Sequence, residues 1–113
     1  MKSFLALYMG STSPDAPSPA DLSEATIAAG MAAWGAWMAK HAGVIVETGG
    51  PLGKTMKASA GGVSNIRNAV TGYVVVRAET HEAATAMFEG HPHFAIFPGD
   101  SVEVMEVLPI PGS

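Results

Sequence analysis

Short stretches rich in aliphatic and aromatic residues occur at three places along the chain, and this pattern predicts β-strands. The clearest is 72–79, GYVVVRAE, where Val75 and Val76 are expected on opposite faces of a sheet because successive strand residues point to opposite sides. The stretch 2–9, KSFLALYM, predicts a first strand that closes at Gly10. The stretch 101–108, SVEVMEVL, predicts a last strand.

Two stretches have helical spacing instead. In 22–42 the larger side chains recur every three or four residues, which predicts one apolar helix face; they are Ile27, Met31, Trp34, Met38 and His41. Asp21 with Glu24 has the spacing of an N-terminal capping box, and Gly43 is expected just beyond the C-terminus. A second helix is predicted to begin after Thr80 and to end at Gly90.

The segments between these elements are short or rich in turn residues. Residues 10–20 hold three prolines and predict a mobile connector, whereas 44–53 predicts a short strand that runs into a Gly/Pro turn. Residues 54–62 are interpreted as a partner strand, followed by a turn. The order β-α-β-β-β-α-β indicates an α+β, ferredoxin-like sandwich whose sheet carries both helices on one face. No repeat or second core is visible, so residues 1–113 are expected to form a single domain.

Composition bears on the other face of that sheet. Hydrophobic residues make up 48% of the chain and charged residues only 14%, which is low against about 25% in soluble proteins. Tyr73, Val75, Met105 and Val107 would lie on the uncovered face. We therefore expect a homodimer that buries this face.

The charges narrow the range of partners. The net charge is −4, and the six cationic residues are scattered along the sequence, so neither nucleic acid nor an anionic membrane is an expected partner. No apolar run approaches the roughly 20 residues of a membrane span, and the run 4–9 is short for the core of a signal peptide. We expect a cytoplasmic protein. The chain has no cysteine, which excludes disulfides and thiolate chemistry.

The turn GHPHF, residues 90–94, holds the most reactive groups. Pro92 biases His91 toward an extended conformation, in which His91 and His93 would point to one side. Histidine titrates near neutrality, so proton transfer by this pair is one interpretation. The other is that one imidazole bonds the turn backbone while the second packs at a dimer edge.

A metal site would need more ligands, and the available side chains lack ligand spacing; they are Glu47, His41, His81, Asp100 and Glu103. We expect no metal and no cofactor. Trp34 and Trp37 are core anchors or an aromatic wall for a flat ligand, with the core interpretation favoured for Trp34. Glu103 interrupts an apolar strand and is either a buried carboxylate with a function or a solvated one that pairs with Arg77.

The C-terminal half, GYVVVRAETHEAATAMFEGHPHF followed by GDSVEVMEVLPI, resembles the YCII-related family over residues 72–110. The helix with both tryptophans and the segment GVIVETGGPLG are similar to the family's first half in kind and order. The resemblance implies a dimeric α+β barrel with a pocket between the sheet and the first helix. The family's candidate helix histidine would fall near Trp34 or Trp37, and the DGPF signature of a sister subgroup is replaced by GGVSNIRNA. Both departures weaken an enzymatic interpretation.

The leading hypothesis is a small-molecule pocket protein of this type, acting as a lyase or isomerase on a small cyclic acid or lactone. His93 would move the proton, and His91 or Glu103 would orient it. Ligand contacts are assigned to six side chains: Tyr8, Trp34, Trp37, Lys54, Met56 and Tyr73. Two alternatives stay open, a non-catalytic binding or regulatory module with the same pocket, and a structural dimer with a vestigial one.

Overall fold

The computed structural model describes residues 1–11, 15 and 18–112, so part of the predicted connector 10–20 lies outside the described residues. The elements follow in the order β1 (Lys2–Met9), η1 (Pro19–Asp21), α1 (Glu24–Lys40), η2 (Ala42–Val44), β2 (Ile45–Pro51), β3 (Thr55–Ser59), β4 (Gly62–Ile66), β5 (Val70–Ala78), α2 (His81–Ala86), α3 (Pro92–Ala95) and β6 (Ser101–Glu106).

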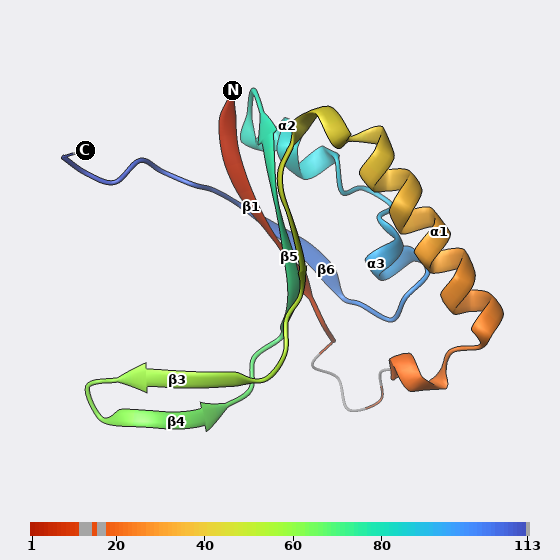
Figure 1. The fold of residues 1–113 in the computed structure, drawn as a ribbon, viewed down its shortest axis with the longest axis horizontal. Coiled ribbons are helices and arrows are strands. Elements are labelled where there is room, and N and C mark those ends of the chain that lie inside the picture. Colours follow the sequence, from red (N-terminus) through yellow and green to blue (C-terminus); the bar gives the residue numbers. More distant parts are fainter. Residues whose placement is uncertain (12–14, 16–17, 113) are drawn as a thin grey trace.

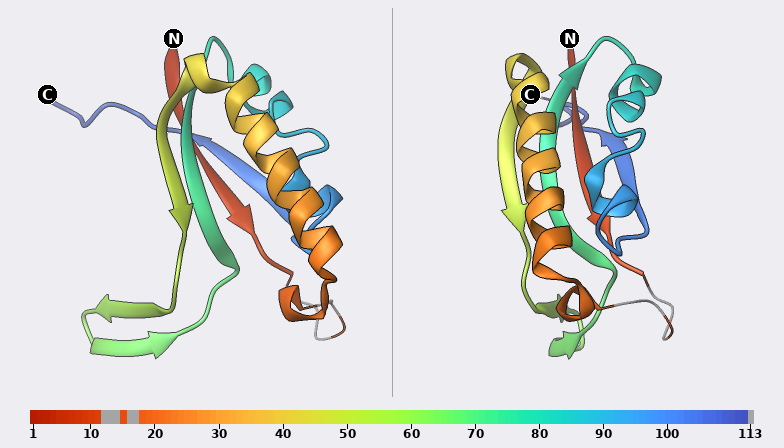
Figure 2. Two further views of the ribbon diagram at one scale, coloured as in Figure 1. Left: turned by 45° about the vertical axis from the view of Figure 1, so that its right-hand side comes forward. Right: turned by 90° about the vertical axis from the view of Figure 1, so that its right-hand side faces the viewer.

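Four of the strands form an antiparallel sheet in the order β2-β5-β1-β6. Helix α1 connects β1 to β2, and β5 lies between these two strands in the sheet. Helices α2 and α3 connect β5 to β6, and β1 lies between those two. These two interleaved β-α-β units make a ferredoxin-like sandwich, so the predicted α+β class is confirmed. The helices cover one face of the sheet and leave the other open (Figures 1 and 2).

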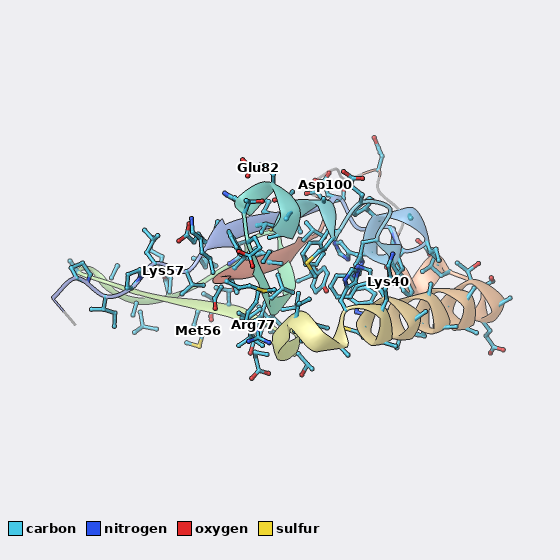
Figure 3. All side chains as sticks on the ribbon, turned by 90° about the horizontal axis from the view of Figure 1, so that it is seen from above. Lys40, Met56, Lys57, Arg77, Glu82 and Asp100 are labelled. Atoms are coloured by element: carbon cyan, nitrogen blue, oxygen red, sulfur yellow. The ribbon has the colours of Figure 1, made fainter. Side chains whose placement is uncertain are left out.

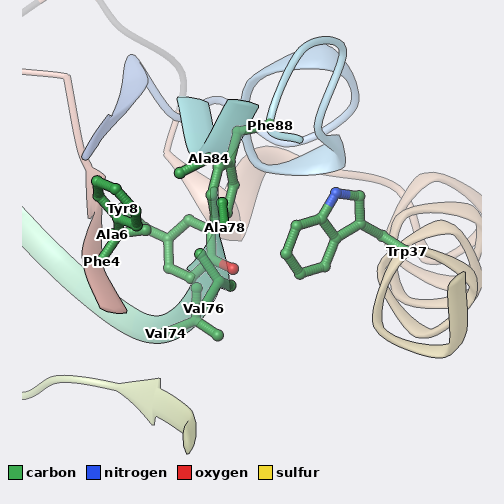
Figure 4. Close-up of a cluster of buried hydrophobic side chains, with 9 residues drawn as sticks. All are labelled: Phe4, Ala6, Tyr8, Trp37, Val74, Val76, Ala78, Ala84 and Phe88. Carbon is green, nitrogen blue, oxygen red and sulfur yellow. The ribbon is translucent and has the colours of Figure 1, made fainter. Parts of the chain in front are cut away.

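Strand alternation explains the core. In β1 and β5 every second residue is buried against the helices, as the pattern of 72–79 predicted. The buried set, drawn in Figure 4, comprises Phe4, Ala6, Tyr8, Trp37, Val74, Val76, Ala78, Ala84 and Phe88. The side chains between them point to the open face, where Leu5 pairs with Val75 on one side and Met105 on the other.

Helix α1 differs from its prediction at both its start and its face. Ser23, not Asp21, is the N-cap, because its hydroxyl accepts the Thr26 N–H at 3.1 Å. Its buried residues are Gly30 and Trp37, whereas Ile27 and Met31 of the predicted stripe are 40% and 62% exposed. The face turns because Gly30 lies directly against the ring of Phe97, where any Cβ would overlap that ring.

The predicted partner strand 54–62 also pairs differently. β3 pairs with β4, a strand that the sequence analysis interpreted as a turn, and the two form a separate hairpin. This hairpin projects from the sheet on the side away from the helices, as does the chain after β6 (Figure 1). Within the described residues, no helix is long and apolar enough to cross a membrane.

Candidate functional site

A cavity of about 670 Å³ lies between the sheet, α1 and the segment that follows α3. Its wall is mainly aromatic, aliphatic and backbone, with Met31 and Trp34 from α1, Tyr8 from β1, and Phe97 and Pro98 from the loop. Among the described residues that line it, the titratable ones are Tyr8, Tyr73 and His93. The cavity therefore suits a flat, largely apolar molecule with few polar atoms.

His93 is the most reactive group at this wall. Its Nε2 donates to the Met9 carbonyl at 2.8 Å, and Gly99 packs so closely that any Cβ there would overlap the ring. A carbonyl only accepts, so Nε2 keeps its proton and the neutral ring carries its lone pair on Nδ1. Among the described residues, no hydrogen bond to Nδ1 is found, and the His93 residue as a whole is 8% exposed. His93 thus presents a proton acceptor, held in orientation by its other nitrogen.

His91 stabilises the turn through its side chain. It is the N-cap of α3, and its Nδ1 accepts the His93 N–H at 3.0 Å. The side chain is completely buried, and its Nε2 has no partner among the described residues. Burial, reinforced by the charges of His93 and His41, lowers the pKa of His91 to about 4. His91 is therefore neutral at pH 7, and its hydrogen bond to the backbone of His93 helps to fix the turn.

The two imidazoles converge by a different route from the predicted one. His91 is extended, with φ −58° and ψ 139°, but residues 92–95 turn into α3, so the expected extended stretch ends at His91. Both rings nevertheless reach Tyr8, with centroid separations of 5.2 Å for His91 and 5.3 Å for His93. The sequence placed them together correctly, although it missed the helical turn.

Tyr8 and Trp34 link these histidines to the cavity. The Trp34 ring lies 4.9 Å from Tyr8 and packs edge-on against His91 at 4.6 Å. Burial raises the pKa of the Tyr8 phenol, and its hydroxyl has no partner among the described residues. In Figure 4 this hydroxyl points from the sheet toward the helix layer. A buried, unbonded hydroxyl costs free energy, which a bound polar atom would recover.

The two tryptophans have different surroundings in the structure. Trp37 is the core residue: it is buried, packs on Phe88, and donates its indole N–H to the Met87 carbonyl at 2.8 Å. Trp34 is partly buried and lines the cavity. Trp34 thus packs against the core and also lines the cavity, whereas Trp37, for which neither interpretation was favoured, does not border the cavity.

Other predicted site residues lie elsewhere. Glu103 pairs with Leu7 on the open face of the sheet and is exposed, whereas His93 is on the helix face, so the proposed His93–Glu103 pair does not exist in the structure. Lys54 and Met56 belong to the β3–β4 hairpin and its base, and neither lines the cavity. Tyr73 does border it.

Sequence reasoning missed Met31, Phe97 and Gly99 as parts of this site. Met31 appeared only as a member of the helix stripe, and Phe97 lies in a loop without periodicity. The signal available was the pair Pro98-Gly99 directly after an aromatic residue, which marks a tight loop close to the histidine turn. Among the described residues, no group of three or more His, Asp or Glu side chains is arranged to hold a metal ion.

Comparison with known proteins supports the fold at a distance. No family model matches the chain, and no curated protein matches it. One similar solved structure is 5-chloro-2-hydroxyhydroquinone dehydrochlorinase (TftG) from Burkholderia phenoliruptrix AC1100, in complex with 2,5-dihydroxybenzoquinone. The match has a TM-score of 0.52 and 16% sequence identity, and covers 91% of this chain and 90% of that one. It shows a distant relationship in fold.

Proposed function

We propose that this protein binds a small, flat cyclic molecule in the aromatic cavity and that His93 exchanges a proton with it. The observation that carries the proposal is the pairing of a fixed His93 ring, whose Nδ1 is free of protein partners, with the aromatic wall of Trp34 and Tyr8. The similar fold of an enzyme solved with 2,5-dihydroxybenzoquinone supports a ring-shaped ligand. We also propose that the chain is a divergent member of the YCII-related family.

The cavity wall narrows the ligand class. Within the described part of the chain, no Lys, Arg, Asp or Glu lines it, so a strongly ionised ligand would lose its hydration without gaining a counter-charge. A lactone or a hydroxylated ring fits this wall better than a cyclic acid, because the unpartnered Tyr8 hydroxyl offers a hydrogen bond to one ring oxygen. The reaction class is isomerisation or elimination, in which Nδ1 takes a proton from a carbon next to a carbonyl.

The alternative is a binding or regulatory module that uses the same cavity without chemistry. The specific observation in its favour is that no carboxylate lines the cavity to assist His93, since Glu103 lies on the opposite face of the sheet. Proton exchange separates the two functions. If the protein is an enzyme, a lactone incubated with it in D₂O should gain deuterium at the carbon next to the carbonyl. If the protein only binds its ligand, the lactone should stay unlabelled.

The binding test uses isothermal titration calorimetry with three probes: a neutral butenolide lactone, and 2,5-dihydroxybenzoquinone and benzoate as two anionic comparisons that should bind more weakly. Trp34→Phe should lower the affinity for the bound probe at least fivefold. Trp37→Phe is the matched control, because Trp37 lies outside the cavity wall and its loss should change stability but not affinity. Failure of all three probes to bind, or equal loss in both variants, would refute the proposed cavity.

His93→Gln tests the chemistry separately from binding. Glutamine retains a donor for the Met9 carbonyl but has no titratable nitrogen, so probe binding should persist while deuterium exchange stops. His81→Gln is the control, because His81 bonds Val104 on the surface. Exchange that survives in His93→Gln would assign the proton transfer to another group.

We further propose that the protein is a homodimer that buries the open face of the sheet. Leu5, Leu7 and Val75 are only partly covered there, and Met105 is 40% exposed. Sedimentation at micromolar concentration should give the mass of two chains, and Leu5→Asp should give one.

A further inference from the structure

The β3–β4 hairpin has no core of its own. Apart from the partly buried Thr55, every residue of its two strands is exposed, and the two strands pair only with each other. An isolated two-stranded hairpin is marginal in water without a packed face. Yet one face of this hairpin is mostly apolar. Ala58 pairs with Val63 there, and Met56 lies two residues along, opposite Asn65. Met56 and Val63 are 67% and 69% exposed.

Charge is divided sharply between the hairpin and the rest of the chain. The segment 48–78 contains four cations and no acidic residue, whereas the remaining residues contain two cations and all ten acids, a net charge of −8. Three of the four cations, Lys54, Lys57 and Arg67, lie on the hairpin or at its base. The cations that looked scattered in sequence are therefore gathered in space.

No ion pair joins these hairpin cations to an acid among the described residues. The ion pair found in the described part of the structure joins Lys2 to Glu106, at the far end of the sheet. Lys54 and Arg67 border a shallow hollow at the hairpin base together with Asn65, Asn68 and Thr55, and no acid lines it. In Figure 3 Lys57 and Met56 point to opposite sides of the hairpin, so each side offers a different contact.

The hairpin lies on the same side of the sheet as the open face. It and the segment after β6 project on the same side of the sheet, away from the helices (Figures 1 and 2). That side is the open apolar face. The projection also explains a radius of gyration of 15.8 Å, against about 13 Å for a compact domain of this length.

We propose that the hairpin is an arm that packs on a second copy of this chain, with the Met56–Val63 face against apolar surface and its cations near the partner's carboxylates. This inference rests on the homodimer proposed above and adds a second contact to it. A second copy supplies both requirements: a body with net charge −8, and partly exposed apolar residues such as Leu5 and Met105 around the exposed carboxylate of Glu103. Attraction of this kind weakens as salt rises.

The first experiment measures the dimer dissociation constant by sedimentation at low and high salt. Lys54→Glu/Lys57→Glu/Arg67→Glu should weaken the dimer at least tenfold at low salt, and Met56→Ser/Val63→Ser should weaken it at both. Lys40→Glu and Ile27→Ser, on α1, are matched controls that should leave it unchanged. Circular dichroism confirms that each variant keeps its fold. Arm variants that dimerise as tightly as the wild type would overturn the proposal.

The second experiment separates the arm from the sheet face. The chain has no cysteine, so Val63→Cys can carry a single environment-sensitive fluorophore. Its emission should shift to the blue over the concentration range in which sedimentation shows dimer formation, while the same label on Glu24→Cys should not respond. Dimer formation without a shift at Val63 would refute the arm and leave the sheet-face dimer standing. A wild-type protein that stays monomeric would refute both, without bearing on ligand binding in the cavity.

Discussion

The two faces of the central sheet are made from neighbouring residues of the same strands, yet they have different physical characters. On the helix face Phe4, Val74 and Val76 are fully buried, and Tyr8 and His91 are enclosed among aromatic rings. On the open face Leu5, Val75 and Met105 keep part of their apolar surface in water. The helix face is buried within one chain, and this burial shifts the pKa values of Tyr8 and His91. The open face keeps apolar surface that could be buried against another chain.

The largest expected effect is on stability and compares Phe4 with its neighbour Leu5. Phe4→Ala removes a fully buried ring and should cost about 3–5 kcal/mol, because the site cannot collapse around the cavity left behind. Leu5→Ala, at low protein concentration, should cost less than half as much, because Leu5 is only partly covered in one chain. Urea unfolding measures both. Equal losses in dilute solution would show that the open face is already covered.

The second prediction concerns acid and the buried His91. Its pKa is about 4 when folded and about 6.5 when unfolded, so the unfolded chain binds more protons between these values. Stability is therefore complete above pH 6.5 and falls as the pH drops toward 4, by roughly 3 kcal/mol in all. Thermal unfolding across this range measures the slope.

His91→Asn provides the matched control for the pH experiment. The asparagine side-chain oxygen can take the place of Nδ1 as acceptor for the His93 N–H, and asparagine is a preferred N-cap, but it does not titrate. This variant should lose most of the pH slope between 4 and 6.5. A slope unchanged by the substitution would assign the acid sensitivity to other groups.

The fold was largely predictable because its strands and first helix follow simple periods. The alternation in 72–79 identified both faces of β5, and the positions of α1 and β6 followed from spacing. β4 was missed because its sequence, GVSNI, contains glycine, serine and asparagine and no core-facing alternation. A hairpin without a buried face has no regular alternation of hydrophobic and polar residues in its sequence, so it is hard to predict.

Some residues that line the cavity were expected from the sequence, but their arrangement was not. The histidine turn and Tyr8 were expected near a pocket, but the sequence did not separate the surroundings of Trp34 and Trp37, because spacing on a helix does not say how far the helix is rotated. That rotation depends on Gly30 and the ring of Phe97, which are 67 positions apart in sequence. The expected pairing of Glu103 with His93 was avoidable. Alternation in β6 already puts Glu103 on the other face of the sheet from Val102 and Val104.

The third prediction compares the tryptophans by stability. Trp37→Phe leaves the Met87 carbonyl without its donor and should cost about 1–3 kcal/mol. Trp34→Phe removes no hydrogen bond given by the described residues and should cost clearly less, while it weakens the binding of a cavity ligand. Chemical denaturation of the two variants measures the difference. A greater stability loss in Trp34→Phe would reverse the assignment of core and cavity.

The smallest expected effect concerns Glu103, and it tests whether the two faces are independent. Glu103 is exposed on the open face, across the sheet from His93, so Glu103→Gln should change the affinity of a cavity ligand by less than twofold. The same substitution removes one carboxylate from the face that we expect to meet a second copy, so it should weaken the dimer modestly at low salt and not at high salt. Fluorescence titration and sedimentation on one preparation measure both quantities. A large loss of ligand affinity with an unchanged dimer would show that Glu103 acts on the cavity after all, and that the sheet does not separate ligand binding from association.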